Sequence, residues 1–351
     1  MDPQETTPIV RWAEPWGANQ GVSTLLLPGV THREPMPSPK RLLERVVGGK
    51  YAIFEYIDSG SFGDVYRAHG PDGVVTVKVL RHIHVGDLEA RDRFREEGRL
   101  MLGVSHPNIV PTLDAGVDET TGEPLFYLVM EHFDGVTLQH AMDLRSERLP
   151  WLFGPTALSI TILVLDALAF LHEQGIVHRD VKPSNVLLAL KDARGREDES
   201  ATTLSGWLNE HLLQKERFLQ NAVMLSDFSI ARKAEADGKH AFTVVAGTPF
   251  FMAPEQFRHT SRPDPKMDVW AVTVMFYYML TGRLPFVGET ADDIRRCAES
   301  GTPPVSILEI IPKLRSIPWG NRLWEIILLG LARDPEDRPD ARTMAQHLRG
   351  P

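Results

Sequence analysis

The hydrophobic pattern of the chain is strand-like in its first part and mostly helical in its second part. Along Val74–Leu80 apolar and polar positions alternate, so Thr76 and Lys78 share one face of a strand and three valines occupy the other. Short apolar runs predict further strands over residues 51–57, 65–68 and 125–130. Helical spacing predicts helices over 88–104 and 157–172, and the apolar run Val269–Leu280 indicates a buried helix.

The composition is that of an ordinary soluble globular protein. Its 351 residues are 42% hydrophobic and 24% charged, which leaves room for two domains. The net charge of −9 argues against a nucleic-acid binder that works through bulk positive charge. Cys297 is the only cysteine, so we expect no intramolecular disulfide and a reducing compartment.

The sequence gives no indication of a membrane protein. The longest apolar run, Val269–Leu280, is too short to cross a bilayer. The first residues, Met1–Glu5, lack the basic start and the apolar core of a signal peptide. We therefore expect a cytoplasmic protein without a membrane span and without a nucleic-acid partner.

Residues 1–47 contain seven prolines and no sustained hydrophobic period, which is typical of a disordered tail. Trp12, Trp16 and the run Leu25–Leu27 are unusual in a pure linker. They could form a docking motif for a partner or for the rest of the chain, but disorder is the favoured interpretation of this segment.

The segment Val177–Leu188 concentrates chemically competent groups between apolar pairs. Pro183 excludes a helix interior, so the segment is an ordered loop between short strands. In this loop Asp180 could accept a proton and Lys182 could neutralise a phosphate. Asn185 could offer a carbonyl oxygen to Mg²⁺. A loop of this composition is where catalytic residues usually lie.

Two further features precede this loop. Gly60 and Gly63 lie in a turn between two predicted strands, where backbone N–H groups can cover phosphates. No helix and no G-K-[ST] follows the turn, which excludes a Rossmann turn and a P-loop. Glu97 falls on the apolar stripe of the predicted helix, where an unpaired carboxylate would be costly, and Lys78 is its natural partner.

The order of these motifs resembles that of eukaryotic-type protein kinases, in particular the soluble serine/threonine kinases of bacterial style. The catalytic loop V-H-R-D-V-K-P-S-N carries most of the resemblance. The other matching motifs, in chain order, are Gly60, Gly63 and Val65 in the glycine turn, Lys78, Glu97, the D-F-S segment at Asp227, the A-P-E segment at Glu255, the D-V-W segment at Asp268 and Arg338, which should pair with Glu255.

The resemblance covers about Lys50 to Arg349 and implies an α+β fold of two lobes. A small antiparallel sheet with one helix would form the N-lobe, about 48–131, within a kinase domain of 48–349. A hinge at 131–135 would lead to a mainly helical C-lobe at 136–349. The C-lobe departs from the family by an insertion at about 189–222, in which an amphipathic helix around Trp207 either covers the lobe surface or binds a partner.

The implied reaction transfers the γ-phosphoryl group of ATP to protein serine or threonine hydroxyls, with Mg²⁺. The resemblance makes Asp180 the group that orients the hydroxyl and takes its proton, and Lys182 the one that stabilises the transferring phosphoryl. Lys78, braced by Glu97, would orient the α- and β-phosphates, and Asn185 and Asp227 would hold Mg²⁺. The implied nucleotide-binding residues are Ile57, Gly60, Gly63, Val65, Thr76, Lys78, Met130 as gatekeeper, Glu131, Phe133 and Leu187.

The resemblance also implies regulation by autophosphorylation of the loop between Asp227 and Glu255. Thr243 is the best acceptor there, and Arg179 would capture its phosphate. Three departures, at Asp58, Thr76 and Ser229, support a competing hypothesis. In that alternative the chain is a pseudokinase that serves as a nucleotide-binding scaffold or allosteric partner.

Overall fold

The structure is a computed structural model, which describes residues 39–60, 63–120, 122–145, 154–189, 222–228, 232–233, 249–257 and 262–350. Several residues singled out in the sequence lie outside these ranges, namely Trp12, Trp16, Leu25–Leu27, Trp207, Ser229 and Thr243. The described part belongs to one compact unit, Pro39–Pro351.

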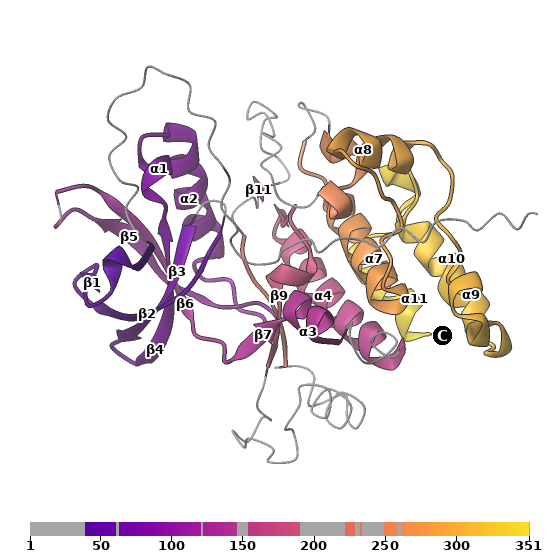
Figure 1. The fold of residues 1–351 in the computed structure, drawn as a ribbon, viewed down its shortest axis with the longest axis horizontal. Helices are drawn as coiled ribbons and strands as arrows, with labels where there is room; N and C mark the ends of the chain where they lie inside the picture. The colour runs from indigo at the N-terminus through magenta and orange to yellow at the C-terminus, as the bar shows by residue number, and fades with distance from the viewer. Residues whose placement is uncertain are drawn as a thin grey trace, which may run out of the picture. The chain divides into compact units, whose positions relative to one another are not determined.

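An antiparallel sheet forms the first lobe, with strand order β1-β2-β3-β4-β6-β5 (Figure 1). Its strands are β1 (Val46–Val47), β2 (Tyr51–Ser59), β3 (Gly63–Gly70), β4 (Gly73–Leu80), β5 (Thr112–Asp118) and β6 (Leu125–Glu131). The single-turn helix α1 (His82–Val85) and the longer α2 (Leu88–Met101) accompany the sheet. This is the small sheet with one main helix that the resemblance implies.

The alternation along β4 produces the two faces that it predicts. Val75, Val77 and Val79 are buried in the hydrophobic core of the sheet. Thr76 and Lys78, on the opposite face, line a cavity. One strand therefore supplies both the core of this lobe and part of a candidate site.

Helix α2 is fixed to the sheet by its start and by one glycine. Asp87 caps the helix by accepting hydrogen bonds from the N–H groups of Glu89 and Ala90. A Cβ at Gly98 would lie 2.8 Å from the Cβ of Ala115 on β5, so glycine allows the helix to approach that strand closely. This close approach offsets the cost of glycine within a helix.

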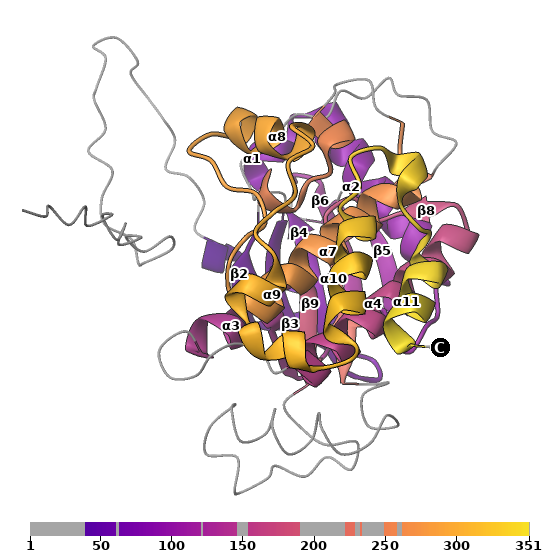
Figure 2. The ribbon, with the colours of Figure 1, turned by 90° about the vertical axis from the view of Figure 1, so that its right-hand side faces the viewer.

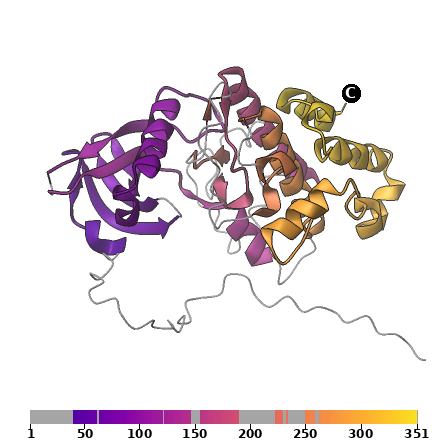
Figure 3. The same ribbon diagram turned by 90° about the horizontal axis from the view of Figure 1, so that it is seen from above.

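The second lobe is mainly helical, and it faces the viewer in Figure 2. The chain enters it through β7 (Gly135–Thr137), which pairs with β9 (Val186–Ala189), itself paired with β10 (Val223–Leu225). Figure 3 shows the sheet and the helices as separate parts of the molecule. The helices are α3 (Leu138–Arg145), α4 (Gly154–Glu173), α7 (Pro265–Thr281), α8 (Ala291–Glu299), α9 (Ile307–Ile310), α10 (Gly320–Gly330) and α11 (Ala341–Arg349).

Short elements complete the second lobe. They are β8 (Ile176–Val177), which pairs with β11 (Arg232–Lys233), and the 3-10 turns η2 (Pro183–Asn185), η3 (Pro249–Phe251), η4 (Pro254–Phe257), η5 (Pro312–Ser316) and η6 (Pro335–Asp337).

Helices α4 and α7 form the centre of this lobe. Trp270 and Phe276 of α7 are fully buried, and α4 packs against α7 and α11. Among the described helices α4 is the one that is long and apolar enough to cross a membrane. Its residues Ile160, Val164 and Leu168 are buried in the protein core, as expected of the core helix of a globular domain.

The described part of the domain begins inside the segment 1–47 that the sequence analysis predicts to be a tail. A 3-10 turn, η1 (Pro39–Leu42), precedes β1, and Leu42 and Val47 are 3% and 1% exposed. Both side chains join the core of the sheet. The folded domain therefore starts upstream of residue 48, because Leu42 and Val47 of this proline-rich stretch pack into the hydrophobic core of the sheet.

The insertion leaves and re-enters the fold between two paired strands. Ala189 N–H donates to the carbonyl oxygen of Ala222 at 2.9 Å, next to the antiparallel pair β9–β10. Ala189 and Ala222 are thus as close as paired residues of a hairpin. A long segment between them adds little to the entropy cost of loop closure.

We expect the insertion to be dispensable for folding and nucleotide binding. Replacing residues 190–221 with a short Gly-Ser turn should preserve the unfolding temperature and the affinity for Mg-ATP, because the flanking strands keep their ladder. Thermal unfolding and calorimetric titration of the two proteins check this. Loss of soluble, nucleotide-binding protein would instead show that residues of the insertion belong to the core.

Candidate active site

A cavity of about 440 Å³ lies between the sheet and the helical lobe. Every residue that the sequence analysis assigns to nucleotide binding lines it, namely Ile57, Gly60, Gly63, Val65, Thr76, Lys78, Met130, Glu131, Phe133 and Leu187. Asp180, Lys182, Asn185 and Asp227 line the same cavity. The fold thus brings residues that are up to 170 positions apart in the sequence to one place, from Ile57 to Asp227.

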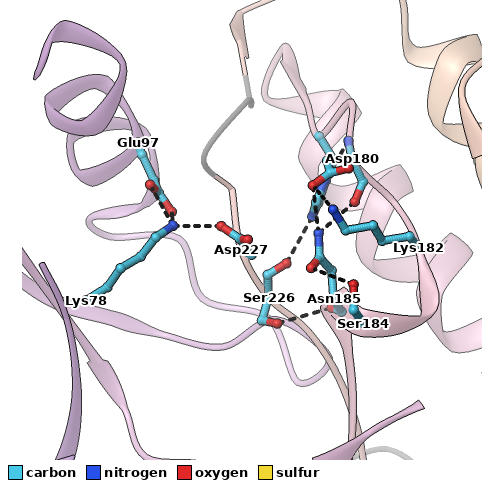
Figure 4. A network of polar contacts seen from close by, with 9 residues as sticks. Lys78, Glu97, Asp180, Lys182, Ser184, Asn185, Ser226 and Asp227 are labelled. Atoms are coloured by element: carbon cyan, nitrogen blue, oxygen red, sulfur yellow. Dashed lines mark hydrogen bonds and ion pairs between the residues drawn. The ribbon is translucent and has the colours of Figure 1, made fainter. Parts of the chain in front are cut away.

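Lys78, which lines this cavity, connects the carboxylates of Glu97 and Asp227 (Figure 4). Its Nζ donates to Glu97 at 2.9 and 3.1 Å and to Asp227 Oδ1 at 2.7 Å. The partnership of Lys78 and Glu97 predicted from the apolar stripe is confirmed. Burial alone would lower the pKa of Lys78, but the adjacent carboxylates of Asp227 and Glu97 raise it, so the side chain is cationic.

The loop before β9 carries a second set of polar groups. Lys182 Nζ donates to Asp180 Oδ2 at 2.7 Å. Asn185 Nδ2 donates to the carbonyl oxygen of Asp180 at 2.8 Å and to its Oδ2 at 3.1 Å. Burial raises the pKa of Asp180, although Lys182 opposes this shift. A carboxylate with increased proton affinity, held in place by two donors, is suited to accept a proton.

The backbone around these residues is held in an uncommon conformation. Arg179 and Asp227 have φ angles of +69° and +60°, in the left-handed region that non-glycine residues rarely adopt. Asp268 Oδ1 accepts from the N–H of Arg179 at 2.7 Å. Gln256 Nε2 donates to the carbonyl oxygen of Arg179 at 3.0 Å. Such strain persists where the surroundings enforce it, and it concentrates at functional sites.

Asp268, at the start of α7, fixes the backbone of the loop that carries Asp180. Its Oδ2 accepts from His172 Nε2 at 2.8 Å and from the N–H of His178 at 2.9 Å. Burial alone would raise the pKa of Asp268, but these donors together lower it, so the carboxylate is ionised. The D-V-W motif therefore acts here as the anchor of the loop.

His178 connects the loop that carries Asp180 with the segment that carries Asp227. Its ring contacts the ring of Phe228 at a centroid distance of 4.7 Å, and its Nε2 lies 3.2 Å from the carbonyl oxygen of Ser226. His178 is fully buried. Movement of either segment would therefore be transmitted to the other.

The site suits Mg²⁺ only together with a phosphate ligand. Within the described ranges no group of three or more His, Cys, Asp and Glu could hold a metal ion. Asp227 contributes a carboxylate that is 39% exposed. Asn185 turns its amide nitrogen to Asp180, and its side-chain oxygen accepts from Ser184 Oγ at 3.5 Å, which leaves this oxygen a second lone pair for a cation. Mg²⁺ commonly binds through one or two protein oxygens plus substrate phosphates. These residues fit that requirement.

Sequence reasoning missed several residues of the cavity wall. His132, Val110 and Ser226 line it in addition to the predicted set. His132 stands within the expected hinge, but nothing in its sequence position shows where its ring points. Val110 lies in the cavity wall because its N–H donates to the carbonyl oxygen of Leu225 at 3.0 Å, which joins two segments that are distant in the sequence.

The sequence is similar to a known protein family and to characterised proteins. The family model described as "Protein kinase domain" matches residues 51–348. Serine/threonine-protein kinase PkaB of Streptomyces coelicolor is 30% identical over 307 residues, which cover 88% of this chain and 64% of that protein. Serine/threonine-protein kinase PknB of Mycobacterium tuberculosis is 32% identical over 311 residues, covering 86% of this chain and 42% of PknB.

A solved structure shows the same fold. The kinase domain of Mycobacterium tuberculosis PknI superposes with a TM-score of 0.60 at 23% identity, covering 88% of this chain and 98% of that domain. The two-lobed architecture expected from the sequence is thereby confirmed. The chain spans 64% and 42% of the lengths of these two curated relatives, PkaB and PknB.

Proposed function

Since the chain belongs to the protein kinase family, we propose that it is a serine/threonine protein kinase, which transfers the γ-phosphoryl group of ATP to hydroxyl groups of protein substrates. The observation that carries this proposal is the cavity in which Lys78, paired with Glu97 and Asp227, faces the set Asp180, Lys182 and Asn185. The names of the curated relatives, both serine/threonine-protein kinases, support the choice of acceptor.

In phosphoryl transfer, positioning and charge neutralisation supply most of the catalysis. Lys78 holds the α- and β-phosphates, and its ion pair with Glu97 fixes the ammonium group. Asp180 orients the acceptor hydroxyl and takes its proton, while Lys182 stabilises the negative charge on the transferring group. Asn185 and Asp227 would hold Mg²⁺, which neutralises charge on the phosphates when it is bound with ATP.

The three departures from the family pattern do not remove a charged group from the site. The Asp58 carboxylate accepts from the N–H of Ser59 at 2.8 Å within its own loop. Thr76 bonds to His132, and Ser229 lies outside the described residues. No observation on the described residues favours the pseudokinase over the enzyme.

We expect Mg²⁺-dependent binding of ATP to the unmodified protein. Changing Asp58→Gly and Ser229→Gly together should tighten it by about tenfold at most, because the Asp58 side chain is exposed to solvent and its repulsion of phosphate is screened. Calorimetric titration with Mg-ATP measures both proteins. Absence of binding in the unmodified protein, with recovery when Asp58 and Ser229 are both changed to glycine, would favour the pseudokinase.

Activation by autophosphorylation is part of the same proposal. Thr243 would be the acceptor and Arg179, beside Asp180, the cation that captures the phosphate. Thr243→Ala should therefore lower turnover and delay its onset after Mg-ATP is added. Turnover measured together with the phosphorylation state by mass spectrometry checks this. Full activity of the variant, with the loop unphosphorylated, contradicts it.

The setting of the enzyme is also proposed. The exposed free thiol of Cys297, the only cysteine of the chain, is compatible with the reducing cytoplasm. The segments 1–47 and 189–222 are the candidates for docking a partner or a protein substrate.

A further inference from the structure

A side-chain contact joins β4 to the segment that follows β6. Thr76 Oγ1 lies 3.0 Å from His132 Nδ1, within hydrogen-bond distance, and both residues line the cavity. Both side chains are partly buried. The glycine turn, Lys78 and the catalytic loop do not need this contact, so it requires its own explanation.

The contact continues the link between two strands beyond the end of their ladder. In the β4–β6 pair Thr76 is opposite Met130, and Val75 is opposite Glu131, the last residue of β6. His132 is the first hinge residue that the ladder no longer holds. Its side chain returns to β4, so the hinge peptide next to the cavity is fixed to the sheet by a hydrogen bond.

The surroundings favour a neutral His132 ring. Burial lowers the pKa of His132, and Arg67 lowers it further, whereas Asp134 and Glu55 oppose the shift. Arg67 is opposite Thr76 in the β3–β4 register and pairs with Glu55 at 2.9 Å. A neutral imidazole can accept the hydroxyl proton of Thr76 or donate to its oxygen, so either tautomer preserves the hydrogen bond.

If the cavity binds a nucleotide, as the proposed function has it, the base can lie beside the hinge, because Glu131, His132 and Phe133 line the cavity. The backbone N–H and C=O groups of the hinge then meet the base with fixed polarity. Adenine offers a donor, its 6-amino group, beside an acceptor at N1. Guanine offers the reverse, an acceptor at O6 beside a donor at N1. A hinge that is free to shift or turn over a peptide could match either base, whereas a fixed hinge can match only one, since an unmatched buried polar group is costly.

We propose that the Thr76–His132 hydrogen bond is a base-specificity element, which fixes the hinge and thereby selects adenine over guanine nucleotides. Thr76 occupies the position where the family pattern has alanine. This departure is therefore a gain of selectivity and not a loss of function.

The experiment compares the affinities for Mg-ATP and Mg-GTP by calorimetric displacement titration. Thr76→Val removes the hydroxyl at nearly constant shape, and His132→Phe removes Nδ1 but keeps a ring. Each should reduce the preference for ATP over GTP about five- to tenfold, the factor expected for one neutral hydrogen bond. The double variant should equal either single variant, because both remove the same contact.

A matched control is Thr161→Val in α4, which removes a buried hydroxyl that donates to the carbonyl oxygen of Ala157 at 2.7 Å, far along the chain from the cavity. It should leave the ATP-to-GTP ratio unchanged. An unchanged ratio in Thr76→Val and His132→Phe, including equal loss of affinity for both nucleotides, would overturn the inference while the proposed function stands. A protein that binds no Mg-ATP would overturn the proposed function and the inference with it.

Discussion

Replacing Asp180 with asparagine should lower turnover by roughly 10²–10⁴-fold, the range that a positioned general base contributes. Asparagine keeps the shape of the side chain and an oxygen that can accept from Lys182, which lies 2.7 Å from the carboxylate. It cannot take the proton of the acceptor hydroxyl. Phosphate transfer to a peptide, measured beside the calorimetric affinity for Mg-ATP, should show loss of the first with little change in the second.

The matched control for this variant is Asp166→Asn. Asp166 lies on α4, is partly exposed and pairs with Arg349 on the protein surface. It should retain full turnover. If Asp180→Asn turns over peptide as fast as the unmodified protein, the catalytic role assigned to Asp180 is wrong.

The second large effect concerns stability. Arg338 is 0% exposed in its side chain, and its guanidinium donates to Glu255 at 2.6 and 2.9 Å, which confirms the pairing expected from the sequence. It also lies 4.9 Å from the centre of the Trp270 ring. Glu255→Ala should lower the free energy of unfolding by about 3–5 kcal/mol, because it leaves a buried cation without its counter-charge.

Urea denaturation measures this effect, with Glu325→Ala as control. Glu325 pairs with Arg322 at 3.4 Å, and both side chains are more than half exposed, so its loss should cost less than about 1 kcal/mol. Equal, small losses in the two variants would show that the carbonyl oxygens around Arg338, such as that of Ala332 at 2.7 Å, compensate the charge without Glu255.

Local patterns were sufficient to predict four strands of the sheet (β2, β3, β4 and β6), the helices α2, α4 and α7, and one long-range pair. The alternation along β4 determines which side chains are buried, and an apolar stripe on α2 predicts that Glu97 needs a cation. Lys78, on the face of β4 that lines the cavity, is that cation, and its Nζ lies 2.9 Å from Oε1 of Glu97. Such predictions succeed because periodicity and the cost of buried charge act irrespective of the overall topology.

Other features depend on the fold as a whole and could not be predicted. The three hydrogen bonds that Asp268 accepts, from His172, His178 and Arg179, come from two segments that only the packing of α7 against the loop brings together. The left-handed backbone of Asp227 has no signal in a sequence that lacks glycine there. The burial of Leu42 in the core of the sheet could not be predicted either, because it depends on a sheet face that the local sequence does not reveal.

The proposed reaction is the transfer of phosphate from ATP to serine or threonine hydroxyls. The most direct measurement incubates the purified protein with Mg-ATP and follows its intact mass and that of a peptide with serine, threonine and tyrosine. Added phosphate on serine or threonine, dependent on Mg²⁺ and abolished by Asp180→Asn, is the predicted result. Saturable binding of Mg-ATP without any transferred phosphate would contradict the proposal that the protein is an active kinase.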